Sequence, residues 1–476
     1  MEDDRRGKLE RLREEGIDPF PHSYAGVQPA QSIATAHADL EPGDETEVAY
    51  RVAGRLTGRR EFGKTAFLDV TDRSGKIQIQ ARKDDLGDES FGRITSLDLG
   101  DILGVDGTAF RSRRGELTLR ASDWLLLAKS LLAPPDKFHG LEDTETRYRR
   151  RELDLIANAE ARELFILRSR VIAAVRRWLD GRGFLEVETP VLQPLYGGAL
   201  ARPFTTHHNA LDRELYLRIA TELYLKRLIV GGMERVYELG KDFRNEGLSP
   251  KHNPEFTMLE WYEAYADYTD IASGLEQLVS FVADEVEYDG EIDFSAPWRR
   301  LTFREAILAE TGLDVLALRD RDGLVAAAKE KGIELDPTET WPRLADELLS
   351  KHVEPKLADP TFVTDYPVEL SPFAKHHRSE PGLVERFECF AAGMEFANAF
   401  TELNDPDEQR ARFEQQAAQT AEGDDEAQPY DADFVRALEQ GMPPTGGIGI
   451  GVDRLVMLLS GRRSIREVVL FPAMRT

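Results

Sequence analysis

The sequence of 476 residues has a single cysteine, Cys389, and no long uninterrupted apolar stretch. One cysteine cannot form a disulfide within the chain, and it argues against a zinc site built from cysteines. No run reaches the ~18 apolar residues that a membrane-spanning helix requires. The first residues are charged and lead into no apolar segment, so we expect no secretion signal and no membrane partner. These features favour a protein of the reducing cytoplasm.

Signatures of several enzyme classes are also missing. The chain shows no Ser-His-Asp or Cys-His arrangement with useful spacing, so covalent catalysis by a side chain is not expected. The glycines at 447, 449 and 451 follow a G-x-G-x-G pattern, which differs from the dinucleotide-binding G-x-G-x-x-G. We expect no phosphate loop either, so a bound ATP would need a different cradle.

Positive charge is scarce overall. Lys and Arg number 61 against 87 Asp and Glu, which gives a formal net charge of −26. That balance argues against indiscriminate binding to polyanions. Residues 51–120 nevertheless carry a small excess of basic side chains, and the segment 147–151 has four arginines among five residues. Both a local nucleic-acid surface and an ordinary solvated surface fit these segments.

The N-terminal part, residues 1–132, changes from helix to strand patterns. A short charged helix is expected at 8–16, followed by about five short alternating strands between 48 and 127. Such strands suit a small barrel of the OB type, with a sandwich fragment as the alternative. Ala133-Pro-Pro-Asp136 opens a linker that we place at 133–150.

Residues 151–476 form the expected second domain, of mixed helices and strands. Its first helix is predicted at 160–182, because apolar residues from Leu164 to Trp178 recur at spacings of three and four. A helical insertion is expected at about 270–350. The fold class is therefore α+β, with a β-barrel ahead of a larger domain.

The densest polar region runs from Tyr237 to Tyr262 and is typical of strand, loop and strand. Period two places Phe256, Met258, Glu260 and Tyr262 on one face, and we expect Arg244 and Glu246 to share a face of the first strand. An aromatic ring, an arginine and carboxylates on one hairpin suit a nucleotide and an amine. A solvated strand face is the alternative.

A second region, 388–405, carries carboxylates within apolar strands. Asn398, Phe400 and Glu402 alternate and so face one way. Glu388 and Glu395 need partners if buried, and Mg²⁺ bridging phosphates is one such partner, with ordinary ion pairs as the other.

A third region lies near the C-terminus. Alternate glycines at 447, 449 and 451 clear one face of an apparent strand, so that a flat group can lie against the backbone. The helix expected after it carries Arg454 in its first turn.

These regions resemble the three motifs of class II aminoacyl-tRNA synthetases. Phe184-Leu-Glu-Val-Glu-Thr-Pro190 resembles motif 1, the stretch from Phe243 to Glu260 resembles motif 2, and Gly447 to Leu458 resembles motif 3. A barrel ahead of them is similar to the aspartyl, asparaginyl and lysyl subgroup. Four strings look specific to the lysyl members, at 218–227, 252–258, 398–405 and 470–475.

The resemblance implies a six- or seven-stranded antiparallel sheet flanked by helices, and an enzyme that activates lysine with ATP and transfers it to lysine tRNA. It also implies Mg²⁺ as cofactor and a homodimer through the motif 1 region. The implied catalytic residues are Arg244 and Arg454. The implied ATP-binding residues are Arg244, Glu246, His252, Asn253, Phe256 and Arg454, and the implied metal ligands are Glu388 and Glu395. Gly198 and Glu222 would receive the lysine α-amino group, and the rest of the lysine site would be Glu260, Tyr262, Asn398, Phe400 and Glu402. The implied anticodon-reading residues are Arg60, Phe67, Gln78 and Glu116.

Other functions stay open at this point. An aspartyl or asparaginyl ligase would need cationic residues where Glu260 and Glu402 stand. A non-charging RNA-binding paralogue would have no need to keep Arg244, Glu388, Glu395 and Arg454 together. A lysyl-transfer enzyme acting on protein or lipid would usually lack the barrel.

Overall fold

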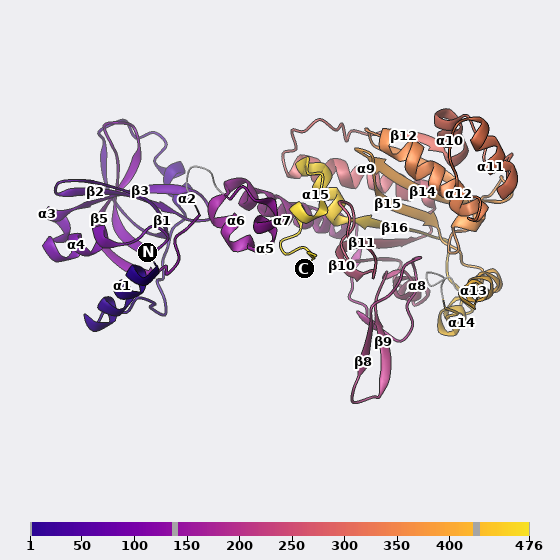
Figure 1. Cartoon of the computed structure of the whole chain (residues 1–476), viewed down its shortest axis with the longest axis horizontal. Helices are drawn as coiled ribbons and strands as arrows, with labels where there is room; N and C mark the ends of the chain where they lie inside the picture. Colours follow the sequence, from indigo (N-terminus) through magenta and orange to yellow (C-terminus); the bar gives the residue numbers. More distant parts are fainter. Residues whose placement is uncertain (1, 136–140, 422–428, 476) are drawn as a thin grey trace. The chain divides into compact units, whose positions relative to one another are not determined.

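The computed structural model describes residues 2–135, 141–421 and 429–475. The chain divides into two compact units, Met1–Arg162 and Glu163–Thr476, which are described separately (Figure 1). The expected linker at 133–150 includes residues 136–140, which lie outside the described residues. Within the described ranges, no helix is both long and apolar enough to cross a bilayer.

The first unit is built on a closed five-stranded barrel, counted over the described residues, with strand order β1-β2-β3-β5-β4. This confirms the barrel expected from the sequence. Its strands are β1 (Glu45–Phe62), β2 (Thr65–Thr71), β3 (Lys76–Arg82), β4 (Ile102–Arg111) and β5 (Leu117–Ala128). Its helices are α1 (Glu2–Glu14), α2 (Ala30–Ala36), α3 (Lys83–Leu86), α4 (Asp88–Ser96), α5 (Thr144–Arg149) and α6 (Arg151–Ala157).

Alternation along the strands fills the barrel. Leu68 and Val70 of β2 and Ile79 of β3 point into the barrel and are buried. Asp69 and Gln78, which alternate with them along the same strands, point to the outside of the barrel. Residues 58–65, with the sequence GRREFGKT, match the phosphate-loop pattern G-x-x-x-x-G-K-T. The structure places them in the β1–β2 hairpin, where Phe62 pairs with Thr65. A phosphate loop joins a strand to a helix, so these residues do not form one.

The arginine-rich segment 147–151 is engaged in ion pairs. Arg147 and Arg151 both contact Asp154, at 2.7 and 2.6 Å. Arg149 lies 2.7 Å from Glu145, and Arg150 lies 2.6 Å from Glu152. These contacts favour a structural role for the segment over a free nucleic-acid surface.

The second unit is organised around a sheet that has eight strands in the described residues, in the order β12-β13-β14-β15-β16-β11-β10-β6. The strands are β6 (Leu185–Glu186), β10 (Arg235–Phe243), β11 (Glu255–Ala264), β12 (Arg299–Thr302), β13 (Thr361–Pro367), β14 (Leu383–Ala391), β15 (Met394–Thr401) and β16 (Thr445–Gly451). The six strands from β13 to β10 are antiparallel, and the short edge strands β12 and β6 pair parallel to their neighbours. The six antiparallel strands agree with the six- or seven-stranded antiparallel sheet that the resemblance implies, and the two short parallel strands extend its edges.

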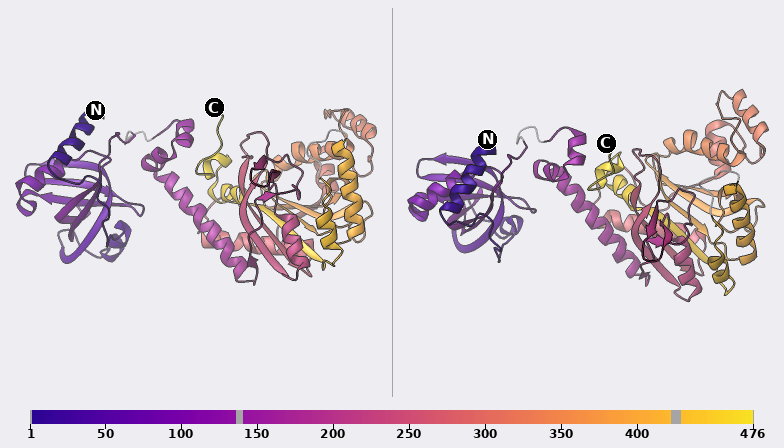
Figure 2. Two further views of the ribbon diagram at one scale, coloured as in Figure 1. Left: turned by 90° about the horizontal axis from the view of Figure 1, so that it is seen from below. Right: turned by 60° about the horizontal axis from the view of Figure 1, so that its bottom comes forward.

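Helices pack around the sheet (Figures 1 and 2). The helices of this part of the chain are α7 (Ala159–Asp180), α8 (Glu222–Val230), α9 (Tyr268–Glu285), α10 (Phe303–Thr311), α11 (Arg321–Glu330), α12 (Trp341–Leu348), α13 (Pro406–Ala421), α14 (Ala432–Leu438), α15 (Val452–Ser460) and α16 (Ile465–Val468). Short turns η1 (Leu349–Val353), η2 (Glu354–Lys356) and η3 (Val368–Leu370) connect them, and a small three-stranded sheet contains β7 (Leu192–Gln193), β8 (Thr205–His208) and β9 (Arg213–Leu217). The predicted helix at 160–182 is confirmed by α7. The helices α9 to α12 lie in the region where a helical insertion is expected.

Period two divides β11 between two environments. Leu259 and Trp261 are buried in a core that includes Val175 of α7 and Leu275 of α9. Glu260 and Tyr262 point to the other face. The sheet therefore has one apolar face under helices and one polar face, and the candidate site lies on the polar face.

Candidate active site

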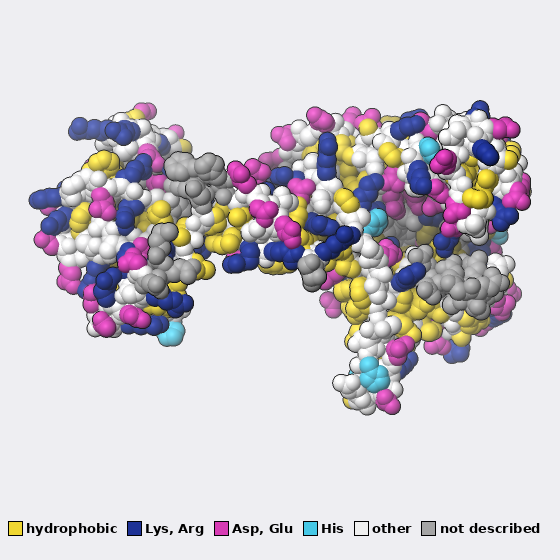
Figure 3. All heavy atoms as spheres, viewed as in Figure 1, with side chains coloured by type: hydrophobic (Ala, Val, Ile, Leu, Met, Phe, Trp, Pro, Cys, Tyr) yellow, Lys and Arg dark blue, Asp and Glu magenta, His cyan; other side chains and the backbone are white. Residues whose placement is uncertain are grey.

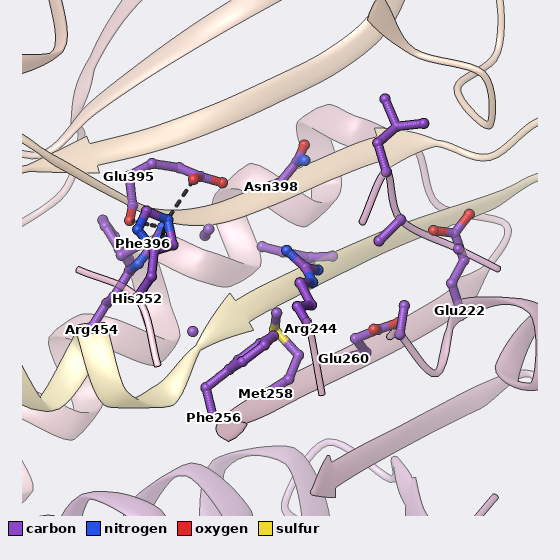
Figure 4. A pocket seen from close by; sticks show the side chains of 18 of the residues that line it. Glu222, Arg244, His252, Phe256, Met258, Glu260, Glu395, Phe396, Asn398 and Arg454 are labelled. Carbon is purple, nitrogen blue, oxygen red and sulfur yellow. Dashed lines mark hydrogen bonds and ion pairs between the residues drawn. The ribbon is translucent and has the colours of Figure 1, made fainter. Parts of the chain in front are cut away.

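A cavity of about 330 Å³ opens on the polar face of the second unit's sheet (Figure 4). It is lined by residues from β11, β15, β16, the β10–β11 loop and the start of α8. Most of the predicted site residues meet here. They are Gly198, Glu222, Arg244, Glu246, His252, Asn253, Phe256, Glu260, Tyr262, Glu395, Asn398, Phe400 and Arg454.

Two of the alternate glycines of β16, Gly449 and Gly451, form the floor of this cavity. In the register of the sheet, Gly447 pairs with Tyr262 on one side and Phe400 on the other. Gly449 pairs likewise with Glu260 and Asn398. Two rows of larger side chains thus flank a strand that has no side chains on this face. Gly449 and Gly451 leave their side of the strand open to the cavity, as predicted, whereas Glu402 and Tyr262 fill the space over Gly447.

One end of the cavity combines an aromatic ring with cations. Phe256 and Met258 rise from β11, and Arg454 stands in the first turn of α15 (Figure 4). Arg454 Nη2 lies 3.2 Å from His252 Nε2. Burial lowers the pKa of His252, and the Arg454 guanidinium lowers it further, so this ring is neutral at physiological pH. A flat aromatic ring beside a guanidinium suits a nucleobase and its phosphates.

Glu395 reaches this end because β15 carries one extra residue. Cys389 of β14 pairs with Ala397, but the next residue, Phe390, pairs with Glu395, so Phe396 bulges from the ladder. Residues three apart on a regular strand point to opposite faces. The bulge lets Glu395 and Asn398 both line the cavity.

The opposite end is closed by buried carboxylates. Glu222, the first residue of α8, and Glu260 of β11 are 4% and 5% exposed. Glu260 accepts hydrogen bonds from the backbone N–H of Thr221, at 3.1 Å, and from the Tyr262 hydroxyl, at 3.0 Å. Burial raises the pKa of Glu260 to about 8, and the neighbouring carboxylates of Asp242 and Glu222 act in the same direction. An ammonium group would relieve this concentration of negative charge.

Gly198 supports the same end. Its φ of +88° is in the left-handed region, and a Cβ there would come within about 3.0 Å of the Glu222 side chain. Any larger residue would therefore displace Glu222.

Glu402 does not line the cavity, although it is buried beside it. It follows β15, and its Oε1 atom and the Tyr262 ring occupy the space over Gly447. Within the described parts of the chain, Oε1 has no hydrogen-bond partner. Burial raises the pKa of Glu402 to about 8.

Lys226 on α8 is a residue that the sequence reading missed. Its ammonium pairs with both Glu222 and Glu402. A signal was present, because Glu222 and Lys226 are four residues apart, the spacing at which opposite charges meet on a helix.

Arg244 lies between the two ends. Its guanidinium carbon is 5.1 Å from the Phe256 ring centre, and its Nε is 3.4 Å from the carbonyl oxygen of Ile219. The expectation that Arg244 and Glu246 share a face of the first strand was wrong, since β10 ends at Phe243 and both lie in the following loop. Both side chains still line the cavity, because residues of a loop can point to the same side without the alternation that a strand imposes.

Glu388 also stays outside the lining of the cavity. Its carboxylate accepts from Arg386, at 2.6 Å, and from the Tyr366 hydroxyl, at 2.8 Å. Arg386, again missed in the sequence, also donates to Asn398 at 3.1 Å. Burial raises the pKa of Glu388 to about 7, partly offset by Arg386 and reinforced by Glu395 and Asp346. Within the described residues, no group of three or more His, Cys, Asp or Glu side chains is placed to hold a metal ion by itself.

Asn253 has a structural connection as well as a place in the lining. Its Oδ1 atom accepts a hydrogen bond from the backbone N–H of Ala473, at 3.1 Å. The loop between β10 and β11 is thereby tied to the segment that follows α16.

The four predicted anticodon residues meet on the outside of the barrel. Arg60 and Phe67 are paired across β1 and β2, and Arg60 donates to Asp69 at 3.2 Å. Gln78 of β3 donates to Glu116 at 2.9 Å. A half-buried ring among amide, guanidinium and carboxylate groups suits stacking and edge recognition of unpaired bases.

Family models match both units. Residues 143–475 match the class II tRNA synthetases (D, K and N), and residues 50–127 match the OB-fold nucleic acid binding domain. The chain therefore belongs to the class II tRNA synthetases of the D, K and N group.

The chain is similar over its whole length to curated members of that group. It is 50% identical to the lysine–tRNA ligase of Dehalococcoides mccartyi, across 98% of this chain and 96% of that protein. It is 51% identical to the lysine–tRNA ligase of Pelotomaculum thermopropionicum, across 99% of this chain and 94% of that protein. It is 52% identical to the lysine–tRNA ligase of Synechococcus sp. strain CC9605, across 100% of this chain and 97% of that protein.

Proposed function

We propose that this chain is a lysine–tRNA ligase, which attaches L-lysine to its tRNA in two steps with ATP. In the first step a lysine carboxylate oxygen attacks the α-phosphorus of ATP, giving lysyl-adenylate and pyrophosphate. In the second step the 3′-terminal ribose hydroxyl of the tRNA displaces AMP. The names and full-length similarity of the relatives support this proposal.

The observation that carries the proposal is the carboxylate end of the cavity. Glu222 and Glu260 are buried there, and Glu402 lies behind Tyr262 with an oxygen that no described residue satisfies. A buried carboxylate that lacks a partner is costly, so the site is built for a cationic ligand. Lysine brings an ammonium at each end of a chain that spans such a pocket.

An acidic or amide substrate fits this end poorly. An aspartate side chain would face Glu260 and Glu222 at close range and be repelled. This is the reason that the aspartyl and asparaginyl alternatives are not favoured. A non-charging paralogue is disfavoured because Arg244, Glu395 and Arg454 remain together in the cavity.

The proposed first step depends on positioning and charge rather than on acid–base catalysis. The attacking carboxylate and the α-phosphate are both anions, and Arg244 lies between the two ends, where it neutralises their repulsion. Phe256 stacks on the adenine, and Arg454 lies over the opposite side and meets the terminal phosphate. Glu246, His252 and Asn253 complete this nucleotide end.

The carboxylates near Arg454 fit a Mg²⁺ ion that arrives with the nucleotide. Glu395 lines the cavity, and it is near enough to Glu388 to contribute to the raised pKa of the Glu388 carboxyl. Mg²⁺ is typically held by one or two carboxylates together with phosphate oxygens and water, so the lack of a larger ligand group suits it. When bound, the ion would supply further neutralisation of phosphate charge. To bind the ion, Glu388 would have to give up part of its hydrogen bonding to Arg386.

The barrel is the proposed reader of the anticodon. Phe67 offers a ring for stacking, and Arg60, Gln78 and Glu116 offer donors and acceptors around it. We place this domain at 1–132, the linker at 133–150 and the catalytic domain at 151–476.

A homodimer and a cytoplasmic location are further parts of the proposal. Around the motif 1 resemblance, Leu185, Leu192 and Leu200 are 52%, 47% and 50% exposed in the single chain. On the face seen in Figure 3, hydrophobic side chains gather at the base of the β8–β9 hairpin. Apolar surface of this kind is typical of an interface between subunits.

ATP–pyrophosphate exchange with a panel of amino acids tests the proposal. Lysine is expected to support exchange, and leucine and methionine are expected to fail, because they leave buried carboxylates unpaired at a cost of about 3–5 kcal/mol. Charging is then measured with lysine tRNA. Exchange with aspartate or asparagine in place of lysine would refute the proposal.

A further inference from the structure

The most completely buried cation beside the candidate site is Lys226. Its side chain is 0% exposed, and its Nζ atom lies 2.5 Å from Oε1 of Glu222. The same ammonium contacts Oε2 of Glu402 and lies 5.3 Å from the ring centre of Phe373. One ammonium therefore bridges two carboxylates that come from distant parts of the sequence.

The two bridged carboxylates are differently placed. Glu222 lines the cavity, whereas Glu402 lies behind Tyr262 and keeps Oε1 without a hydrogen-bond partner in the described chain. Gly447 leaves the space that Glu402 and Tyr262 occupy. The bridge uses Oε1 of Glu222 and Oε2 of Glu402, so Oε1 of Glu402 is left without a hydrogen bond among the described residues.

The surrounding cations have other partners. Arg386 is paired with Glu388 at 2.6 Å, and Arg218 is paired with Asp242 at 3.1 Å. Arg244 lies further along the cavity, over Phe256. Lys226 is thus the cation that bears directly on Glu222 and Glu402 together.

We propose that Lys226 is a positioning and specificity-determining residue that holds Glu222 and Glu402 in place as partners for the two ammonium groups of the amino acid. This inference rests on the proposed function. The bridge holds the carboxylates at a set separation before the substrate binds, and such preorganisation reduces the free energy that binding must spend. The residue acts through the two carboxylates and need not touch the substrate.

The physical reason lies in the environment of the carboxyl groups. Burial raises the pKa of both Glu222 and Glu402, and Lys226 opposes that rise. Burial also acts to lower the pKa of Lys226, but the two carboxylates together raise it above its usual value. Without the bridge, the pKa of both carboxyl groups would rise further, and lysine would have to reorient them as it binds.

Lys226→Met tests this proposal, because methionine keeps an unbranched chain and removes the charge. Exchange is titrated separately with lysine and with ATP. We expect the KM for lysine to rise about tenfold or more, as is typical when one partner of a buried charge pair is removed, with the KM for ATP changed by less than about twofold. Lys226→Arg keeps the charge in a displaced position, and an intermediate KM for lysine is expected.

Lys129→Met is the matched control. Lys129 is also a buried lysine bridging two carboxylates, Asp98 at 2.7 Å and Asp101 at 2.8 Å, but it belongs to the first unit. Its loss is expected to lower the melting temperature and to leave the KM for lysine unchanged. Circular dichroism and thermal unfolding are followed for every variant.

Several outcomes would overturn the inference. An unchanged KM for lysine in folded Lys226→Met would do so, as would an equal rise in the KM for ATP. Should the methionine variant not fold, Lys226→Gln replaces it with the same expectation. If neither Lys226→Met nor Lys226→Gln folds while Lys129→Met does, the role of Lys226 is purely structural and the inference is wrong. Lack of lysine-dependent exchange in the unmodified protein would refute the proposed function itself.

Discussion

Arg454 Nη1 lies 3.0 Å from the Oε2 atom of Glu395 and 2.7 Å from the carbonyl oxygen of the same residue. A helix residue thereby fixes both the side chain and the backbone of a strand residue at the β15 bulge. Arg168 supports the same helix from α7, with its Nη1 atom 2.6 Å from Asp453. The nucleotide end of the cavity is therefore held by contacts between α7, α15 and β15.

Replacing Arg454 with alanine removes both the proposed phosphate contact and the anchor of Glu395. Lysine-dependent exchange is expected to fall by about 100-fold, in line with the loss of a preorganised charge. Lysine binding without ATP, followed by calorimetry, should stay within about twofold of the unmodified protein. Exchange that is nearly normal would remove Arg454 from the mechanism.

Glu260→Gln and Glu402→Gln are expected to damage the use of lysine in particular. Each change removes a negative charge next to the proposed ammonium site, so the KM for lysine should rise by about 100-fold, with little effect on ATP. Glu263→Gln on the same strand is the matched control, because Glu263 pairs with Arg235 on the other face of β11. Undiminished lysine activity in both test variants would count against the assignment.

Lysine binding should strengthen as the pH rises from about 7 to about 9. Burial raises the pKa of Glu260 and of Glu402 to about 8, so the empty site holds protons below that pH. Lysine, with a side-chain pKa near 10.4, remains charged and displaces these protons. Calorimetry at pH 7 in buffers of different ionisation enthalpy should detect the release, and binding without proton release would disprove it.

Glu260 and Glu402 should make the folded protein less stable as the pH rises, although lysine binding becomes stronger. Their folded pKa is raised above the unfolded value near 4.5, so their contribution is fully present below that value and is lost as the pH rises to about 8. Saturating lysine should reduce this loss. Chemical unfolding across the pH range, with and without lysine, provides the comparison.

Gly447→Ala should disrupt the amino-acid end even without substrate. A Cβ at 447 would overlap Oε1 of Glu402 and the ring of Tyr262. A Cβ at Gly449 would meet only Met258 Sδ at 3.6 Å and Glu260 Cγ at 3.8 Å. We expect the 447 variant to lose about 1–3 kcal/mol of stability and the 449 variant much less. Equal melting temperatures would contradict this geometry.

The barrel should matter for tRNA and not for lysine activation. Deletion of residues 1–135 is expected to spare pyrophosphate exchange and to cripple charging. Phe67→Ala should lower charging by about tenfold, the effect of losing one stacked base, with exchange unchanged. Equal loss of both activities on deletion would give the barrel a structural role instead.

The sequence by itself determined the elements and most of the site. Alternation predicted the face of β11 with Phe256, Glu260 and Tyr262, and the glycines at 449 and 451 predicted the floor of the cavity. These patterns repeat every two residues along one strand, so they need no knowledge of the rest of the chain. The strands of the barrel likewise follow from local alternation, whereas the three motifs were identified by their resemblance to a known family.

Only the tertiary structure decided the contacts between distant segments. It placed Lys226 between Glu222 and Glu402, paired Glu388 with Arg386, and put the bulge in β15 that turns Glu395 into the cavity. Packing across the sheet decides whether a given carboxylate binds a metal, binds the substrate or pairs with a lysine of the protein. Local periodicity carries no information about that choice, because charge pairing in a buried site is settled by distance and desolvation in three dimensions.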